Sequence, residues 1–254
     1  MTKKILALVL AFLTTDVLMA QTTILSKTTI LPKTTVIAAA PGIGCVQGGT
    51  GCTSATSTSN SQSSGAGGTL TLTLLSAVSS GDFVFVHLSY GFANYPTSPL
   101  FNGNAMTCLQ YSTTADAYDS FCYIANVTTG GTVATFTCPS YCAGIIYEFS
   151  GVATSTPLDA TSTTNSTGTT WTATTSTALA ATGELGLGVN LCPSGPCVSS
   201  VNIPFLNTQC TSYTTGGGAN GMVTCWVVLS SASAATFSGT SSQSALGVAV
   251  AVFK

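Results

Sequence analysis

FVFVHLSY, at residues 83–90, carries apolar side chains on both faces of an extended chain. A strand of this kind is buried on both sides, so it is typical of the centre of a sheet. It follows SSGD (residues 79–82), a turn-forming sequence. We therefore expect residues 83–90 to form a central strand with further strands beside it and layers on both faces.

Other short runs of β-forming residues surround this strand. We expect further strands at 69–75, 121–127, 132–138, 143–151, 184–191, 222–230 and 245–253, with more in the Thr/Ser-rich residues 153–182. The polar sequence YSTTADAYD (111–119) is typical of a turn. Residues that favour helices are scarce. The pattern predicts an all-β fold: an antiparallel, jelly-roll-like β-sandwich.

The last predicted strand, ALGVAVAVF (245–253), has unequal faces. Leucine and valines alternate with alanines and a glycine, and Phe253 closes the strand. Because one face is so small, we expect it to pack closely against another layer.

The N-terminus predicts export. Residues 1–20 have the basic start, apolar run and Leu18-Met19-Ala20 cleavage site of a signal peptide, with a buried first helix as the alternative. No second long apolar run follows, so we expect no membrane span after the signal is removed. We expect the mature protein to be secreted, extracellular or at the cell surface, with residues 41–254 as a single domain.

Residues 21–40 contain a six-residue repeat, TTILSK, TTILPK, TTVIAA. Six is an even number, so the blocks stay in phase in an extended strand. Ile24, Ile30 and Val36 share one face, which carries no charge, whereas Lys27 and Lys33 fall on the other. This phasing predicts a strand that pairs with a neighbouring subunit. The alternative is a flexible spacer.

Charged residues make up only 5% of the chain, and Lys254 is the only lysine or arginine after residue 40. No basic patch can therefore form, which argues against nucleic-acid and anionic-membrane partners.

Ten cysteines in an exported chain predict disulfides. Spacing does not determine their connectivity, and local pairing is the simplest arrangement. Zinc binding is disfavoured because the gaps are wide and only one histidine is present. The neighbouring couples are Cys45 and Cys52, Cys108 and Cys122, Cys138 and Cys142, Cys192 and Cys197, and Cys210 and Cys225.

Several segments in order carry a resemblance: GDFVFVHLSYG, then IIYEFSGVATSTPLDATS, then LGVAVAVFK. Over about residues 70–254 the chain resembles a widespread group of bacterial secreted jelly-roll or concanavalin-like β-sandwich domains of unassigned activity. The resemblance implies a fold and leaves the activity open. The cysteines and the six-residue repeat depart from the group's pattern.

Few residues suggest chemistry. His87 could act as a general base, but a hydrogen-bonded core histidine is the simpler interpretation. Asp116 and Asp119 could be paired carboxylates for glycoside hydrolysis or calcium ligands, but they lie in the predicted turn, where aspartate is common for backbone reasons. Glu148 lies in a buried run, and we expect it to accept backbone hydrogen bonds from the turn near Asp159. We therefore expect no catalytic residues, no metal and no cofactor.

Tyr90, Phe92 and Tyr95 could stack against sugar rings, with ordinary packing as the alternative. The sequence predicts an extracellular structural or adhesive protein that self-associates, with filament assembly through the N-terminal strand. The alternative is a secreted carbohydrate-binding module.

Overall fold

The computed structural model describes residues 55–56, 68–74, 77–90, 95–114, 117–128, 130–138, 142–164, 168–192, 200–202, 205, 210–214, 221–242 and 247–254. All regular structure in these residues is β-strand, and every pairing between strands is antiparallel. The predicted all-β, disulfide-linked antiparallel sandwich is confirmed.

The first half of the described chain forms two sheets. The five-stranded sheet has the order β1 (Ala55–Thr56), β9 (Cys142–Phe149), β3 (Phe83–Tyr90), β7 (Ala117–Ile124) and β6 (Thr107–Thr114). The four-stranded sheet has the order β2 (Gly68–Thr73), β8 (Val133–Cys138), β4 (Thr97–Phe101) and β5 (Asn104–Ala105).

The second half also forms two sheets. The five-stranded sheet has the order β10 (Leu158–Thr164), β17 (Gly247–Phe253), β12 (Leu185–Cys192), β15 (Gly221–Val228) and β14 (Cys210–Thr214). The three-stranded sheet has the order β11 (Thr170–Thr174), β16 (Thr236–Thr240) and β13 (Ser200–Val201).

The two halves have the same topology, a jelly roll in which two sheets exchange strands in Greek-key order. In the first half β1-β9-β3-β7 faces β2-β8-β4-β5, with β6 added beside β7. In the second half β10-β17-β12-β15 faces β11-β16-β13, with β14 added beside β15. The chain is therefore an internal repeat of two jelly rolls, which we name the first and second repeat.

Matching backbone hydrogen bonds support this repeat. The N–H of Gly81 donates to the carbonyl of Val127 at 2.8 Å, and the N–H of Gly183 donates to the carbonyl of Leu229 at 2.7 Å. Both glycines have positive φ, 92° and 87°, which glycine adopts without steric cost. The dipeptides Gly81-Asp82 and Gly183-Glu184 thus make the same turn into β3 and β12.

Side chains also match between the repeats. The sequence Ala-Thr-Phe occurs at 134–136 in β8 and at 235–237 at the start of β16, with alanine and phenylalanine buried in both. One disulfide joins Cys108 to Cys122 across β6 and β7, and another joins Cys210 to Cys225 across β14 and β15.

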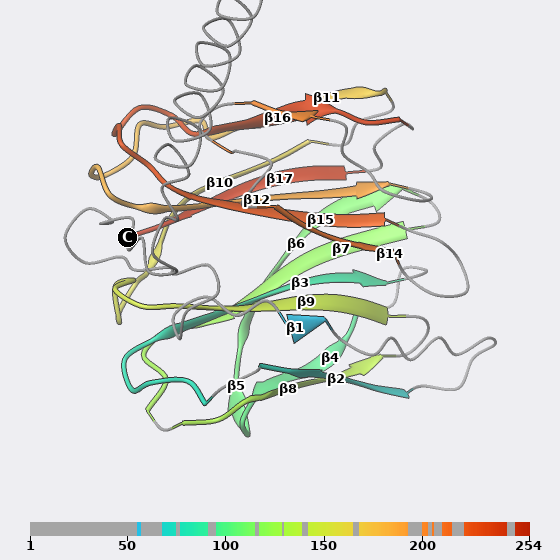
Figure 1. The fold of residues 1–254 in the computed structure, drawn as a ribbon, viewed down its shortest axis with the longest axis vertical. Helices are drawn as coiled ribbons and strands as arrows, with labels where there is room; N and C mark the ends of the chain where they lie inside the picture. The colour runs from blue at the N-terminus through green and yellow to red at the C-terminus, as the bar shows by residue number, and fades with distance from the viewer. Residues whose placement is uncertain are drawn as a thin grey trace, which may run out of the picture. The chain divides into compact units, whose positions relative to one another are not determined.

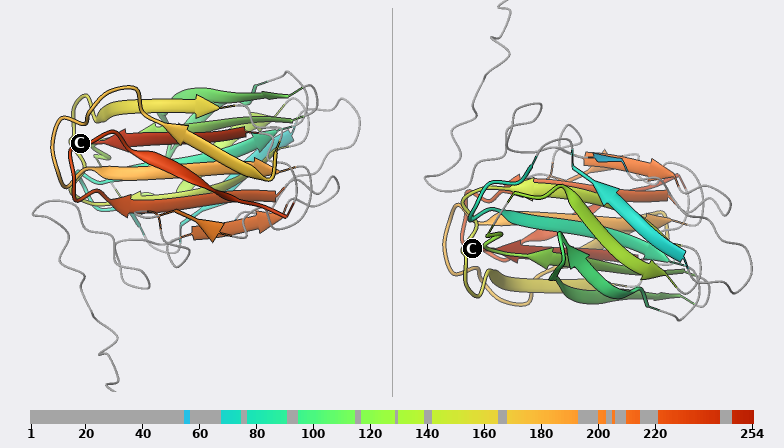
Figure 2. Two further views of the ribbon diagram at one scale, coloured as in Figure 1. Left: turned by 90° about the horizontal axis from the view of Figure 1, so that it is seen from above. Right: turned by 90° about the horizontal axis from the view of Figure 1, so that it is seen from below.

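The four sheets stack in layers (Figure 1), and Figure 2 shows the strands of the stacked sheets from above and below. The two five-stranded sheets lie in the middle and the two smaller sheets outside them. Three hydrophobic cores fill the spaces between neighbouring layers. We name the core between the two five-stranded sheets the central core.

β3 is the central strand that the sequence predicts. Phe83 and Phe85 lie in the central core, whereas Val84 and Val86 lie in the core of the first repeat. The last strand behaves as predicted too: Val248 and Val250 enter the core of the second repeat, and Ala249 faces the central core.

The prediction of a turn at 111–119 is wrong for most of that segment. Residues 107–114 form β6 and residues 117–124 form β7, paired as a hairpin. This polar segment forms strands because the disulfide Cys108–Cys122 holds the hairpin and Asp119 is buried within it.

Three of the predicted disulfides are confirmed: Cys108–Cys122, Cys138–Cys142 and Cys210–Cys225. Cys192 is buried, and Cys45, Cys52 and Cys197 lie outside the described residues. The signal peptide, the repeat segment with Ile24, Ile30 and Val36, and the domain boundary at residue 41 also lie outside them.

The close packing of β12 against the outer sheet predicts a steric requirement at Gly188. A Cβ atom there would overlap the ring of Phe237. We expect Gly188→Ala to lower the free energy of unfolding by about 1–3 kcal/mol, as overpacked cores do. Chemical denaturation measures this. The control Gly168→Ala, whose Cβ would meet its nearest atom at 3.6 Å, should change stability far less. Equal effects of the two substitutions would contradict the packing argument.

Candidate functional site

A buried polar cluster lies in the central core. The first repeat supplies His87 from β3, Tyr111 from β6 and Asp119 from β7, and the second repeat supplies Thr224 from β15. His87 reaches the central core because it shares a strand face with Phe83 and Phe85.

Hydrogen bonds satisfy both ring nitrogens of His87. Its Nδ1 lies 2.8 Å from Oγ1 of Thr224, and its Nε2 lies 2.7 Å from the hydroxyl of Tyr111. Both partners are hydroxyl groups, which can donate or accept, so each ring nitrogen has a partner in either tautomer. The bond to Thr224 joins the two repeats.

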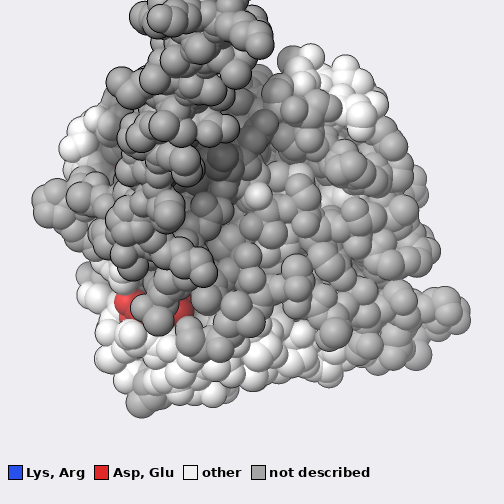
Figure 3. Space-filling view, viewed as in Figure 1, with Lys and Arg blue, Asp and Glu red and all other residues white. Residues whose placement is uncertain are grey.

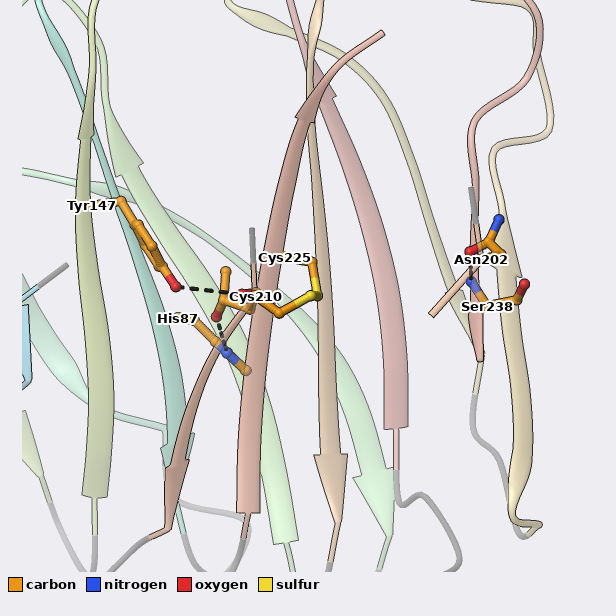
Figure 4. Close-up of a disulfide and its surroundings, with 7 residues drawn as sticks. His87, Tyr147, Asn202, Cys210, Cys225 and Ser238 are labelled. Carbon is orange, nitrogen blue, oxygen red and sulfur yellow. Dashed lines mark hydrogen bonds between the residues drawn. A yellow bond between two sulfur atoms is a disulfide. The ribbon is translucent and has the colours of Figure 1, made fainter. Parts of the chain in front are cut away.

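A second hydrogen bond crosses the same interface. The Tyr147 hydroxyl donates to the Thr224 carbonyl at 3.4 Å. Figure 4 shows His87 and Tyr147 reaching toward the second repeat beside the disulfide Cys210–Cys225. The two hydrogen bonds hold β15 against the first repeat, and the disulfide joins β15 to β14 within the second repeat.

Asp119 completes the cluster. One of its carboxyl oxygens, Oδ1, lies 3.6 Å from Nε2 of His87, and the side chain has no exposed surface. Burial raises the pKa of Asp119, while the neighbouring imidazole and phenol act in the opposite direction. Burial, reinforced by the charge of Asp119, raises the pKa of Tyr111 well above its ordinary value.

Histidine, carboxylate and threonine hydroxyl are the components of a nucleophilic site. The sequence offered no nucleophile or orienting acid for His87, and the structure brings Thr224 and Asp119 to it. However, His87, Asp119 and Thr224 are each 0% exposed. A substrate cannot touch them in this arrangement. Instead, the cluster links the two repeats through the hydrogen bond between His87 and Thr224.

A second polar site lies at the start of β3. Oε1 of Glu148 accepts a hydrogen bond from the N–H of Ser79 at 3.3 Å. The prediction that donors near Asp159 bind Glu148 is therefore wrong, because the turn before β3 supplies this donor. Burial, followed by a hydrogen bond to the Asp82 carboxyl, raises the pKa of Glu148 from 4.5 to about 7.

The predicted sugar-stacking aromatics do not form one exposed surface. Tyr90 is 0% exposed, so its ring face is not available to a glycan. Tyr95 is 37% exposed, and its ring meets that of Tyr90 edge-on with centroids 5.7 Å apart. Phe92 and Asp116 lie outside the described residues.

The outer faces of the two outer sheets carry hydroxyl groups. β2 exposes alternate threonines, and so does the equivalent strand β11; they are Thr69, Thr71 and Thr73, and Thr170, Thr172 and Thr174. In the view of Figure 3 the described atoms show two small acidic spots and no lysine or arginine.

Other candidate sites are modest. A hollow of about 280 Å³ lies in the turn between β15 and β16 and is lined by serines and alanines without a titratable group. No three metal-ligating side chains gather within the part of the chain that the structure describes. That part also holds no helix with the length and hydropathy that a membrane crossing requires.

Comparison with known proteins found no matching family, no matching curated protein and no matching solved structure.

We expect the stability of the fold to depend on the buried hydrogen bond between His87 and Thr224. Thr224→Val should leave Nδ1 of His87 without its partner and lower the free energy of unfolding by about 1–3 kcal/mol. Urea denaturation measures the change. In the matched control Thr236→Val, an exposed hydroxyl loses its 2.9 Å bond to Thr174, and we expect almost no change. A Thr224→Val variant as stable as the control would contradict a stabilising hydrogen bond between the two repeats.

The raised pKa of Glu148 predicts greater stability in acid. A folded pKa of about 7 against an ordinary 4.5 means that the folded state holds its proton longer than the unfolded state. The resulting stability is fully present below about pH 4.5 and is lost as the pH rises through 7. Asp119 and Glu184, whose pKa values are also raised, act in the same direction.

Denaturation at intervals from pH 5 to pH 8 tests this. The free energy of unfolding should decrease across this range, and Glu148→Gln, which mimics the protonated acid, should make the decrease smaller. An unchanged slope in this variant would show that Glu148 does not titrate as described.

Proposed function

We propose that this protein is an extracellular structural protein whose copies join through the N-terminal segment at residues 22–37. Three disulfides within the described residues are compatible with an oxidising compartment. The observation that carries the proposal is the phased apolar pattern of residues 22–37, which suits a strand at the edge of a five-stranded sheet.

In the second repeat a full strand forms this edge. β10 spans seven residues and pairs with β17 at six positions, from Leu158 opposite Phe253 to Thr164 opposite Val248. The equivalent strand of the first repeat is β1, whose two residues pair with β9 at Ile145 and Ile146, and the residues on both sides of β1 lie outside the described part of the chain.

The segment at residues 22–37 has the properties of a strand for such an edge. β9 is buried along all eight of its residues, so a strand beside it needs apolar side chains at regular intervals. Ile24, Ile30 and Val36 recur every six residues, and each block advances about 20 Å in an extended chain. The two lysines of this segment, Lys27 and Lys33, fall on the opposite face.

Donation between copies would produce an assembly. A strand passed to the next copy adds backbone hydrogen bonds along a sheet edge. Repeated head to tail without closing, this contact gives a filament. The low charge of the chain favours such packing, because few like charges meet between copies. The two-repeat block, joined through one core, would be a stiff unit for it.

Deletion of residues 22–37 from the mature protein tests the assignment. We expect the full-length protein to form filaments in negative-stain images and the deleted protein to remain a folded monomer with the same β-type circular dichroism. A synthetic peptide of residues 22–37 should bind the deleted protein.

Single substitutions sharpen the test. Ile30→Asp places a charge on the apolar face and should abolish assembly, whereas the control Lys33→Gln, on the other face, should leave it intact. Filaments that persist after the deletion, or a full-length protein that stays monomeric, would show that the segment is only a spacer.

A further inference from the structure

The end of β17 is fastened beside the start of β10. The N–H of Lys254 donates to the Pro157 carbonyl at 2.8 Å, and the N–H of Ala153 donates to the Lys254 carbonyl at 2.6 Å. Leu158 lies opposite Phe253 in the ladder of the two strands. The backbone of Lys254 is therefore held on both sides, which limits where its side chain can reach.

The side chain of Lys254 meets an acidic pair. Its Nζ lies 3.4 Å from Oδ1 of Asp159. The other oxygen of Asp159, Oδ2, accepts a hydrogen bond from the N–H of Ala180 at 2.9 Å. Asp159 is 12% exposed and Lys254 is 43% exposed, so the carboxyl group is mostly enclosed while the amine is reached from solvent.

Glu184 lies against the Asp159 carboxyl. It is 3% exposed, and its Oε1 accepts a hydrogen bond from the N–H of Ala181 at 3.2 Å. Its Oε2 is buried and has no hydrogen-bond partner in the protein. Burial, followed by the charge of Asp159, raises the pKa of Glu184. A raised pKa suits a carboxyl group that must both take and give a proton.

We propose that Lys254 and Asp159 form an intramolecular amide cross-link, with Glu184 as the catalytic acid and base. This modification site would join the first strand of the second repeat to its last strand. It does not depend on assembly between copies.

The reaction is a condensation in which atoms and charges balance. Transfer of one proton within the ion pair gives a neutral amine on Lys254 and a carboxylic acid on Asp159. The Nζ lone pair attacks Cγ of Asp159, a bond forms between Nζ and Cγ, and the bond from Cγ to its hydroxyl breaks. Glu184 takes the proton that Nζ releases and gives one to the departing hydroxyl, so one water molecule leaves and nothing is oxidised or reduced.

Placement is the main contribution of the fold to this step. The Nζ atom lies 3.4 Å from Oδ1, which is bonded to the Cγ that Nζ attacks. Groups held close together react at very high effective concentrations, so an amide that forms negligibly in dilute solution can form within a protein. The chain provides no competing amine nearby in sequence, since Lys254 is the only lysine or arginine after Lys33.

Intact-mass measurement of the full mature chain, denatured and reduced, tests the cross-link. We expect the wild-type mass to be smaller than that of the linear chain by one water molecule. Pepsin digestion should release a branched peptide in which the Asp159 segment is joined to Lys254. Lys254→Arg, which keeps the positive charge at this exposed position, and Asp159→Ala should both show the mass of the linear chain.

A matched control comes from the first repeat. Glu184→Gln should slow formation of the cross-link at least tenfold in freshly refolded protein, while Glu148→Gln, in the carboxyl pair with Asp82, should leave the rate unchanged. A wild-type chain that retains the linear mass after prolonged incubation from pH 6 to pH 9 overturns the proposal. Because the mass is measured on denatured single chains, this result is independent of whether filaments form.

Discussion

Burial of two sheet faces against each other is the constraint on which the rest of this structure depends. Phe253 lies at the end of the second repeat. Its ring centroid is 4.8 Å from that of Phe83 and 5.2 Å from that of Tyr123, both in the first repeat. Either repeat alone would expose this aromatic face to water, which soluble domains avoid. The two jelly rolls therefore stabilise each other, and neither is expected to be independent.

Polar groups within this contact give it one register. Apolar surfaces alone tolerate sliding, whereas the imidazole of His87 is satisfied only when Thr224 lies opposite it. A shift of β15 along β3 would leave buried donors and acceptors without partners, at about 1–3 kcal/mol each. The same residues that resemble a catalytic constellation thus have a structural use, since the core that aligns them also excludes solvent.

The two buried glutamates of the described chain lie in similar surroundings. Glu148 and Glu184 are both nearly enclosed, each next to a second carboxyl group, and burial raises the pKa of both. The outer sheets present threonine hydroxyls instead of charges. Such a molecule has little electrostatic repulsion toward its own copies, which agrees with the proposed role in assembly. The proposed cross-link between Lys254 and Asp159 would hold β17 to β10 covalently.

Sequence alone determined the local features. Alternation and apolar runs located β2, β3, β8, β9, β12, β15 and β17, and short cysteine spacings located three disulfides, because these depend on neighbours along the chain. The strand expected at 121–127 corresponds to the second half of β7, whereas β6 and the start of β7 have the sequence pattern of a turn, because Asp119 and Ser120 are polar although the tertiary structure buries them. Only the tertiary structure decided which residues meet across layers: His87 with Thr224, 137 residues apart, and Lys254 with Asp159. Those pairings follow from how two diverged repeats stack, and no local pattern encodes a contact between separate sheets.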